Sequence, residues 1–539
     1  MKPASGIPLL IGVSGHRDLG GAENVAAVRS RVERFFERLQ ARYPNTALVL
    51  YSGLAQGADQ LVAEAAIARG ISLVAVLPMP RQLYEDEFPG AALPQFREIL
   101  ARADRAIELP LLSGTNDEHI KSDPERKSIH AQEQYAALGD FLAVRTQLLL
   151  ALWNGVESPA LGGTAWTIRA KLTGKLRADA ERLDPIELGL IYVIPAANET
   201  DSTAALPAEG FLAADGVKPY SDALRDIDVY NAHPQVSASG QDPLADARDR
   251  ADALAIQYRT LLSRTRNVLA GVVSVLVLSF GVYAELARTP VVLLIYFAAL
   301  VVGAAVWTWQ RNVHVEKRFF EYRALAEALR IQHVWLSSGL PHSVEGSYLR
   351  KHAGELHWIR LVLRGYATDG DVVATLAARR AARAAPGRPE EYPAARRWIA
   401  EQSNYFQAAA VRRSRLVKRL RSLARMLYGV GLATAAGTGV ALFLEAAPVL
   451  EHLLVFAMAV APAFAGIILS WIDQTGIEDE ARQTTRMARL FETARRDWDE
   501  HPTLRTALMR ELGKEAVYEN ADWLLMHRSR PLEAPLSPG

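Results

Sequence analysis

Four long apolar segments in the second half of this 539-residue chain constrain its fold more than any other feature. They cover residues 267–284, 291–309, 426–444 and 449–472. At a rise of about 1.5 Å per residue, a helix of about 20 residues crosses the roughly 30 Å hydrocarbon core of a bilayer. Each segment is close to this length, so the sequence predicts four membrane-spanning helices in two hairpins. The alternative is two helical hairpins buried in a soluble core.

The charges that flank these segments predict how they cross the membrane. Arginine and lysine gather before the first segment, after the second and before the third, whereas the two short hairpin turns contain only Arg288. The flanking cations are Arg259, Arg264, Arg266, Arg311, Lys317, Arg318 and the basic run from Arg412 to Arg425. Because basic loops stay on the cytoplasmic side, we expect a multi-pass protein of the inner (cytoplasmic) membrane with both termini in the cytosol.

The two hairpins resemble one unit that is used twice. Residues 323–335 (RALAEALRIQHVW) follow the second apolar segment at nearly the same distance as residues 487–498 (MARLFETARRDW) follow the fourth. Each unit is thus a helix, a hairpin and a helix that ends in Trp. Such same-direction repeats suit a bundle that forms a homo-oligomer. The alternative is that any two membrane hairpins look alike.

Before these segments, short β-rich runs alternate with stretches of helical periodicity. We expect helices over residues 22–42 and 58–69, before Arg102, and from about Ile129. The expected strands are residues 7–13, 47–51, 71–77, 105–109, 148–153 and 188–194. This alternation is typical of an α/β domain with a Rossmann-like, doubly wound parallel sheet. Ligands of such sheets bind outside the carboxyl ends of the strands.

Three glycine-rich segments follow predicted strands. They are GVSGHRD (12–18), SGLAQGAD (52–59) and GGTAW (162–166). Glycine leaves backbone N–H groups open at the start of a helix, where they can cradle a phosphate, and Arg17 can add a bidentate fork. The alternative is steric, because strand-to-helix turns need glycine in any case, and Asp59 could simply cap its helix.

These motifs, together with VAVLPMP, YEDEF (84–88) and ALWNG, resemble the SLOG superfamily over roughly residues 7–195. Its members are Rossmann-like domains related to DNA-processing protein A and to the cytokinin-activating LOG phosphoribohydrolases. The resemblance implies a nucleotide or nucleotide-derived ligand, including messengers of the ADP-ribose type, and no other cofactor. The positions that match the motifs are Gly12, Ser14, Gly15, His16, Arg17, Ser52, Gly53, Gly57, Asp59, Gly162, Gly163 and Thr164.

One departure from that superfamily bears on catalysis. The hydrolytic LOG enzymes follow their glycine-threonine turn with a glutamate, whereas Thr164 is followed by AWTIRAK, which contains no carboxylate. Without that acid we expect the domain to bind its ligand rather than cleave it, and no catalytic residue is assigned. The enzymatic alternative is a membrane-tethered nucleotide glycosidase or phosphoribohydrolase that uses Asp59, Glu64 or His16 as its acid or base.

The membrane half resembles the SLATT group, two-helix membrane effectors associated with SLOG domains and with nucleotide-dependent defence systems of bacteria. EYRALAEALR (321–330) and ENADWLLMHRSRPLE (519–533) carry this likeness. The resemblance implies a sensor-effector, in antiphage or conflict defence, that binds a nucleotide second messenger in the cytosol and permeabilises or gates the membrane as an oligomer. A further alternative is a non-catalytic membrane scaffold.

These interpretations divide the chain into five parts. They are a SLOG-like nucleotide-binding domain (1–195), a linker or irregular lobe (196–243), a SLATT-like unit (244–365, hairpin 267–309), a basic linker (366–400) and a second SLATT-like unit (401–539, hairpin 426–472).

Other patterns do not change this interpretation. His352 and His357 lie five residues apart, not the four that place two ligands on one helical face, so no metal site is expected beside Glu355. The basic runs 379–388 and 412–425 could attract nucleic acid. Anionic lipid explains the second run more simply, and no specific nucleic acid partner is expected. The absence of cysteine excludes disulfides and thiolate metal sites.

Overall fold

The computed structural model describes residues 6–123, 128–158, 161–176, 188–197, 206–214, 216–234, 242–338, 340, 344, 357–367, 392–444 and 447–528. The chain divides into two compact units. The first comprises Met1–Ala247 and Pro341–Pro386, and the second comprises Arg248–Leu340 and Gly387–Gly539. Several predicted features lie outside the described residues: His352, Glu355, the basic run 379–388, most of the basic linker 366–400, and the end of the motif 519–533.

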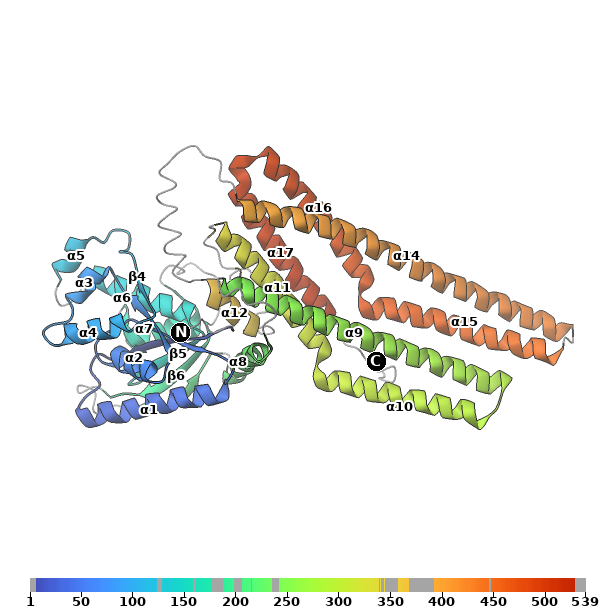
Figure 1. Ribbon diagram of the computed structural model, residues 1–539, viewed down its shortest axis with the longest axis horizontal. Helices are drawn as coiled ribbons and strands as arrows, with labels where there is room; N and C mark the ends of the chain where they lie inside the picture. The colour runs from blue at the N-terminus through green and yellow to red at the C-terminus, as the bar shows by residue number, and fades with distance from the viewer. Residues whose placement is uncertain are drawn as a thin grey trace. The chain divides into compact units, whose positions relative to one another are not determined.

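The first unit is built on a seven-stranded sheet (Figure 1). Its strands are β1 (Leu9–Gly15), β2 (Leu48–Ser52), β3 (Ser72–Leu77), β4 (Arg105–Glu108), β5 (Leu148–Trp153), β6 (Leu190–Pro195) and β7 (Gly210–Leu212). Their spatial order is β4-β3-β2-β1-β5-β6-β7, and every pair is parallel except β6 with β7. The predicted Rossmann-like α/β fold is confirmed.

The helices of this unit follow the predicted apolar periodicity. Along α1, the stripe Val28, Val32 and Phe35 is buried at the three- and four-residue spacing of one helix face. By contrast, β5 (LLLALW) is buried along its whole length, as expected for a parallel strand covered on both faces. The helices are α1 (Ala22–Arg42), α2 (Ala58–Ala68), α3 (Arg81–Glu85), α4 (Ala92–Ala101), α5 (Asp117–Lys121), α6 (Ile129–Arg145), α7 (Gly163–Thr173), α8 (Val217–Asn231) and α12 (His357–Ala367).

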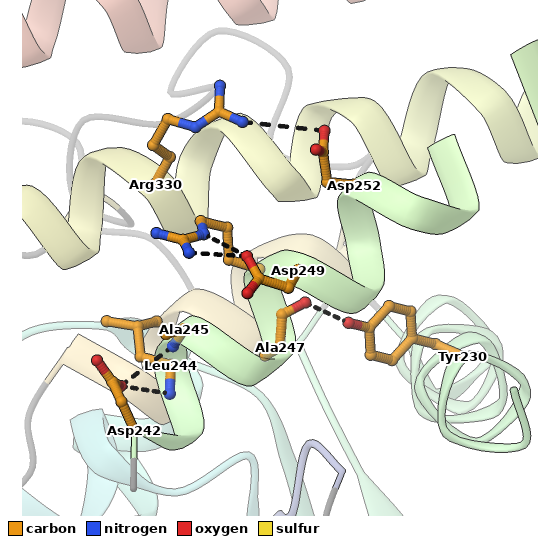
Figure 2. Close-up of polar contacts among 9 residues, drawn as sticks. Tyr230, Asp242, Leu244, Ala245, Ala247, Asp249, Asp252 and Arg330 are labelled. Carbon is orange, nitrogen blue, oxygen red and sulfur yellow. Dashed lines mark hydrogen bonds and ion pairs between the residues drawn. The ribbon is translucent and has the colours of Figure 1, made fainter. Parts of the chain in front are cut away.

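Residues 196–243, which the sequence predicts as a linker or an irregular lobe, contribute β7 and α8 to this unit. Asp228 of α8 accepts hydrogen bonds from the backbone N–H of Asn45 (2.9 Å) and from the Thr46 hydroxyl (2.8 Å), just before β2. The hydroxyl of Tyr230 donates to the carbonyl of Ala247 at 2.6 Å, in the first turns of the following long helix (Figure 2). Asp242 caps the start of that helix through the backbone N–H groups of the third and fourth residues of DPLA (242–245). The lobe is therefore joined to the sheet through β7 and Asp228, and to the start of α9 through Tyr230 and Asp242.

The helix α12 also packs on the α/β unit. The side chain of Gln147, at the start of β5, accepts from the Leu10 N–H at 2.7 Å and donates to the Leu361 carbonyl at 2.9 Å. The buried guanidinium of Arg145 donates to the carbonyl of Arg364 at 2.8 Å. In the sequence-based division, residues 357–365 belong to the first helical unit. These contacts place them against the amino-terminal edge of the sheet.

The second unit is entirely helical within its described residues. Its elements are α9 (Pro243–Gly281, of which the part from Arg248 belongs here), the π-helical turn η2 (Val282–Leu286), α10 (Pro290–Val313), α11 (Val315–Ser337), α14 (Pro393–Phe443), α15 (Pro448–Thr475), α16 (Ile477–Glu500), the 3-10 turn η4 (Pro502–Leu504) and α17 (Arg505–Arg528). We call α9 with α10 the first hairpin and α14 with α15 the second hairpin (Figure 1).

The helices α9, α10, α14 and α15 are each long and apolar enough to cross a membrane. At most 17% of any of the four apolar windows is buried inside the protein. Apolar helices of a soluble core would bury most of that surface. The structure thus argues against soluble, buried hairpins and for a multi-pass membrane protein.

Each hairpin joins its following helix through the same arrangement. In the first joint, His314 adopts φ 53° between α10 and α11, and Arg266 of α9 pairs with Glu316 at 2.8 Å. In the second joint, Gly476 adopts φ 60° between α15 and α16, and Arg421 of α14 pairs with Glu478. Both glutamates lie two residues after the left-handed residue.

A second pair of contacts repeats with the same spacing. The Tyr258 and Tyr322 rings pack 5.6 Å apart between α9 and α11, and Arg413 donates to Thr484 between α14 and α16. Tyr258 precedes Arg266 by eight residues, as Arg413 precedes Arg421. Because both contacts recur at the same spacing, the two hairpins are equivalent in structure as well as in sequence pattern.

The helix α17 packs on both halves of this unit. Asn520 donates to the Ala324 carbonyl of α11 at 3.0 Å, and the Trp523 indole N–H donates to Glu480 of α16 at 3.0 Å. A Cβ atom on Gly513 would lie 2.3 Å from the Trp335 indole nitrogen, so α17 approaches α11 closely there. Elsewhere in the unit Arg330 of α11 lies 3.9 Å from Asp252 of α9 (Figure 2).

Candidate functional site

The strand order places a topological switch point between β1 and β5. From β1 the chain adds β2, β3 and β4 on one side, then returns to β5 on the other side of β1. Crossovers that leave in opposite directions open a crevice at the carboxyl ends of the two central strands. The segments that occupy this edge are GVSGHRD after β1 and ALWNG after β5, both singled out by the sequence.

The two loops at the switch point contact each other through His16. Its Nε2 atom accepts the backbone N–H of Asn154 at 3.2 Å, and its own backbone N–H donates to the Leu152 carbonyl at 3.3 Å. These two contacts tie the end of β1 to the end of β5.

The turn before α2 is closed against the β1 loop. The N–H of Ala58 donates to the His16 carbonyl at 3.1 Å. At Gly57 (φ 90°), a Cβ atom would lie 2.0 Å from the Arg17 carbonyl oxygen, and at Gly15 it would lie 2.4 Å from the Cβ of Ala58. Gly57 and the last glycine of β1 are thus required sterically, and the first N–H of α2 already has a partner.

Beneath this turn lie the other polar residues of the second motif. Ser52 is fully buried, and its hydroxyl accepts from the Leu54 N–H at 3.1 Å. Burial raises the pKa of Asp59 from 3.8 to about 7, although backbone N–H groups of Ala55 and Gly53 and the charge of Arg17 act in the opposite direction. Asp59 is 7% exposed. It holds the loop from within rather than presenting its carboxylate to solvent.

Arg17 is the exposed cation of this edge. Its Nη2 atom pairs with the Glu87 carboxylate at 3.0 Å, and its guanidinium lies 5.5 Å from the centre of the Tyr135 ring. The Arg17 side chain is 55% exposed, whereas that of Glu87 is 4% exposed. Tyr135 also donates its hydroxyl proton to Glu87. The buried carboxylate and the tyrosine, whose side chain also hydrogen-bonds to Arg17, fix the direction of the guanidinium, and more than half of the Arg17 side chain is exposed.

The start of α7 lies beside the same tyrosine. A Cβ atom on Gly162, the residue before the helix (φ 78°), would lie 2.9 Å from the Cβ of Tyr135. Among the described residues, which leave out 159 and 160 just before it, no side chain caps this helix start. Gly163 (φ 77°) is exposed, and a Cβ atom there would meet nothing within 4 Å. Unlike the turn before α2, this helix N-terminus is open.

The structure thus sorts the predicted site residues into three groups. Arg17, Gly162 and Gly163 meet around Tyr135 at the surface. His16, Gly15 and Gly57 lock the loops together beneath them. The others are buried in or under the strands: Gly12, Ser14, Ser52, Gly53, Asp59 and Thr164.

The sequence-based list omitted three residues that shape this edge, namely Glu87, Tyr135 and Asn154. Glu87 and Asn154 lie within YEDEF and ALWNG, so those motifs already contained the signal for both residues. Tyr135 lies in the middle of α6, where an aromatic residue at helical spacing gives no indication of a site.

The chemistry available here is that of anion binding. A half-exposed guanidinium and a helix N-terminus without a side-chain cap among the described residues both favour a phosphate. Glu64, a candidate catalytic acid, is instead paired with Arg29 at 2.7 Å on the outer side of α2. Comparisons with models of protein families, with curated proteins and with solved structures find no match to this chain.

Proposed function

We propose that this protein is a membrane-bound sensor-effector whose α/β domain binds a phosphate-bearing nucleotide signal at the β1–β5 switch point. The observation that carries the proposal is the meeting of Arg17 and the open N-terminus of α7 around Tyr135, in a chain with four long apolar helices. The resemblance to SLOG and SLATT proteins supports the same pairing of a nucleotide sensor with a membrane effector in bacterial defence.

The ligand would lie with its phosphate between the Arg17 guanidinium and the first N–H groups of α7. Tyr135, whose ring lies beside Arg17 and whose Cβ lies beside Gly162, offers an edge for a ribose or base. Such a ligand changes the state of the membrane helices only if it binds two arrangements of the protein with different affinities. The expected output is permeabilisation or gating of the membrane by an oligomer, because four spans whose charged groups, such as Glu451, lie only near their ends do not line a polar pore alone.

The proposal is tested by thermal-shift measurements on the full chain in detergent, with nucleotides, cyclic oligonucleotides and ADP-ribose derivatives. Ligand at a hundred times its Kd stabilises a protein by about 2.7 kcal/mol, a shift of several degrees. We expect Arg17→Gln and Gly163→Asp to abolish the shift. The matched control is Gly70→Asp, which has the same backbone sign (φ 70°) and the same open surroundings but precedes β3 at the opposite edge of the sheet.

A ligand that stabilises all variants equally would place the site elsewhere. No shift with any compound, in a chain that unfolds cooperatively, would favour the scaffold alternative. A hit should also release dye from liposomes that contain the wild-type protein and not from liposomes that contain Arg17→Gln.

A second candidate function is nucleotide hydrolysis, and the observation that favours it is the carboxyl of Asp59. The raised pKa of this buried carboxyl, about 7, suits a general acid, and a ligand would have to reach it through the turn before α2. Release of free base from a bound nucleotide, lost in Asp59→Asn, would assign this activity. Retention of the intact ligand would favour the sensor.

A further inference from the structure

A cavity of about 660 Å³ lies between the two hairpins, within the second unit. Its walls are formed by α9, α10 and α15, and most of its lining is apolar, with Leu276, Leu300 and Ile467 among the larger side chains. All three helices are apolar enough to span a membrane. Such a cavity would therefore open towards acyl chains rather than towards water.

One end of the cavity is polar. It is lined there by Arg266, Trp307, Gln474 and Thr475, where the three helices leave their apolar runs. Among the described residues, neither the Nε–H of Arg266 nor the indole N–H of Trp307 has a hydrogen-bond partner, although both nitrogens are buried. Buried donors are nearly always satisfied in native proteins. Two unpaired donors at one end of a cavity indicate a ligand that carries acceptor oxygens.

Charged side chains from α9, α10 and α11 lie at this end of the cavity. Arg266 already shares its Nη2 proton with Glu316 at 2.8 Å, and Arg311 stacks over the Trp307 ring at 4.9 Å. Against these two guanidinium groups stand two carboxylates, those of Glu316 and of Asp473, the residue before Gln474. The unpaired donors, together with guanidinium groups of the kind that hold anionic lipid headgroups between membrane helices, therefore favour a phosphate here.

The depth of the cavity matches one leaflet. From Arg266 to Leu276 the helix rises about 15 Å, which is half of the roughly 30 Å hydrocarbon thickness. Beyond this depth the hairpins close on each other. A Cβ atom on Gly281 would lie 3.0 Å from the Phe456 ring, and His452 of α15 lies 3.4 Å from Glu285. The space ends where the opposite leaflet begins.

We propose that this cavity binds one anionic phospholipid of the leaflet at the basic ends of the helices. Its phosphate accepts hydrogen bonds from Arg266 and Trp307, and its acyl chains lie along α9, α10 and α15. The lipid thereby fills the gap between the two hairpins. This inference rests on the membrane location of the helices and is independent of the nucleotide site.

The test is native mass spectrometry of the full chain, extracted into detergent and incubated with an equimolar mixture of phosphatidylglycerol and phosphatidylcholine. We expect the wild-type protein to retain phosphatidylglycerol in preference to phosphatidylcholine. Gly466→Leu should reduce that retention at least fivefold, because Gly466 lines the cavity and a side chain there meets nothing within 4 Å and can fill it. The matched control is Gly439→Leu, at an equally open position on the exposed face of α14.

A second variant tests the headgroup. Trp307→Phe keeps the ring and removes one N–H donor, and we expect a reduction of roughly two- to fivefold, as for the loss of one hydrogen bond. Equal retention of both lipids by the wild-type protein would overturn the assignment of an anionic headgroup. Equal retention of phosphatidylglycerol by Gly466→Leu, Trp307→Phe and Gly439→Leu would overturn the site itself. Neither result depends on a nucleotide.

Discussion

The two hairpins of the membrane unit share one joint but pack in different ways. In the second hairpin, Gly431 of α14 faces Pro462 of α15 so closely that a Cβ atom would lie 2.5 Å from the proline ring. Ala461 and Ala465 are buried in the same contact. In lipid, where the hydrophobic effect does not drive helices together, small residues on facing helices allow such a close approach.

The first hairpin is more open. Within α10, all of which the structure describes, Gln310 alone is buried. Its approach to α9 is made by Gly303, where a Cβ atom would lie 3.0 Å from Val272. The joints fix the direction in which each hairpin leaves the soluble helices, whereas the small residues decide how tightly it closes. One hairpin is thus packed on itself, and the other leaves room for a lipid.

The largest expected effect comes from filling the contact that distinguishes the second hairpin. Gly431→Leu must push α14 away from Pro462, and overpacking of this kind costs about 3 kcal/mol. Gly303→Leu meets only the end of the Val272 side chain and should cost about 1 kcal/mol. The measurement is the thermal midpoint of each variant in the same detergent, with Gly439→Leu as the control. Equal losses for Gly431→Leu and Gly303→Leu would remove the difference between the hairpins.

A smaller effect is expected at the residue that links the two halves. Glu519 of α17 faces Arg323 of α11 and Arg413 of α14, and Glu327 and Glu480 also surround it. Burial raises its pKa from 4.5 to about 7, against the effect of the two arginines. The folded protein therefore holds this proton more tightly than the unfolded chain, so the group destabilises the fold increasingly as the pH rises from about 4.5 to about 7.

Glu519→Gln removes this penalty. We expect the variant to exceed the wild-type protein in stability by about 2 kcal/mol at pH 8 and to match it at pH 4. The measurement is the thermal midpoint as a function of pH. Because the pKa of Asp59 is also raised to about 7, Asp59→Asn is measured in parallel to separate the two contributions. A variant that is less stable than wild type at pH 8 would mean that Glu519 is held as a charged partner of Arg323 and Arg413.

The sequence predicted the elements of both units closely, for a physical reason. A helix that is buried on one face repeats apolar residues every three or four positions, as α1 does. A strand that is buried on both faces is a continuous apolar run, as β5 is. The four apolar segments are easier still to recognise, because a helix that crosses a bilayer must be both long and apolar. The helix α8 was missed although it buries Tyr220, Leu224 and Ile227 at helical spacing, because the stretches rich in Ala, Ser, Pro and Gly on either side of it obscure this pattern. The packing of α12 on the sheet was missed because it depends on residues far away in the sequence, such as Gln147.

The site was predicted less completely. Glycines after strands indicate turns, but they have two different roles here. Gly57 closes a turn against Arg17, whereas Gly163 leaves a helix N-terminus open. Only the structure separates the two, because the difference lies in what stands opposite each residue. Tyr135 could not be predicted for a similar reason, since it reaches this edge of the sheet only through the packing of α6.

The smallest predicted effect tests whether the two joints are equivalent. Both need a left-handed residue, but the first joint has His314 and the second has Gly476. A side chain in this conformation costs about 1 kcal/mol, so Gly476→Ala should destabilise the protein by that amount. His314→Gly should stabilise it by less, because glycine also gains freedom in the unfolded chain. Thermal midpoints of both variants, with Gly429→Ala on the exposed face of α14 as the helix control, check this. If Gly476→Ala cost no more than Gly429→Ala, the left-handed residue would not be what turns α15 into α16, and the equivalence of the joints would rest on the Arg–Glu pairs alone.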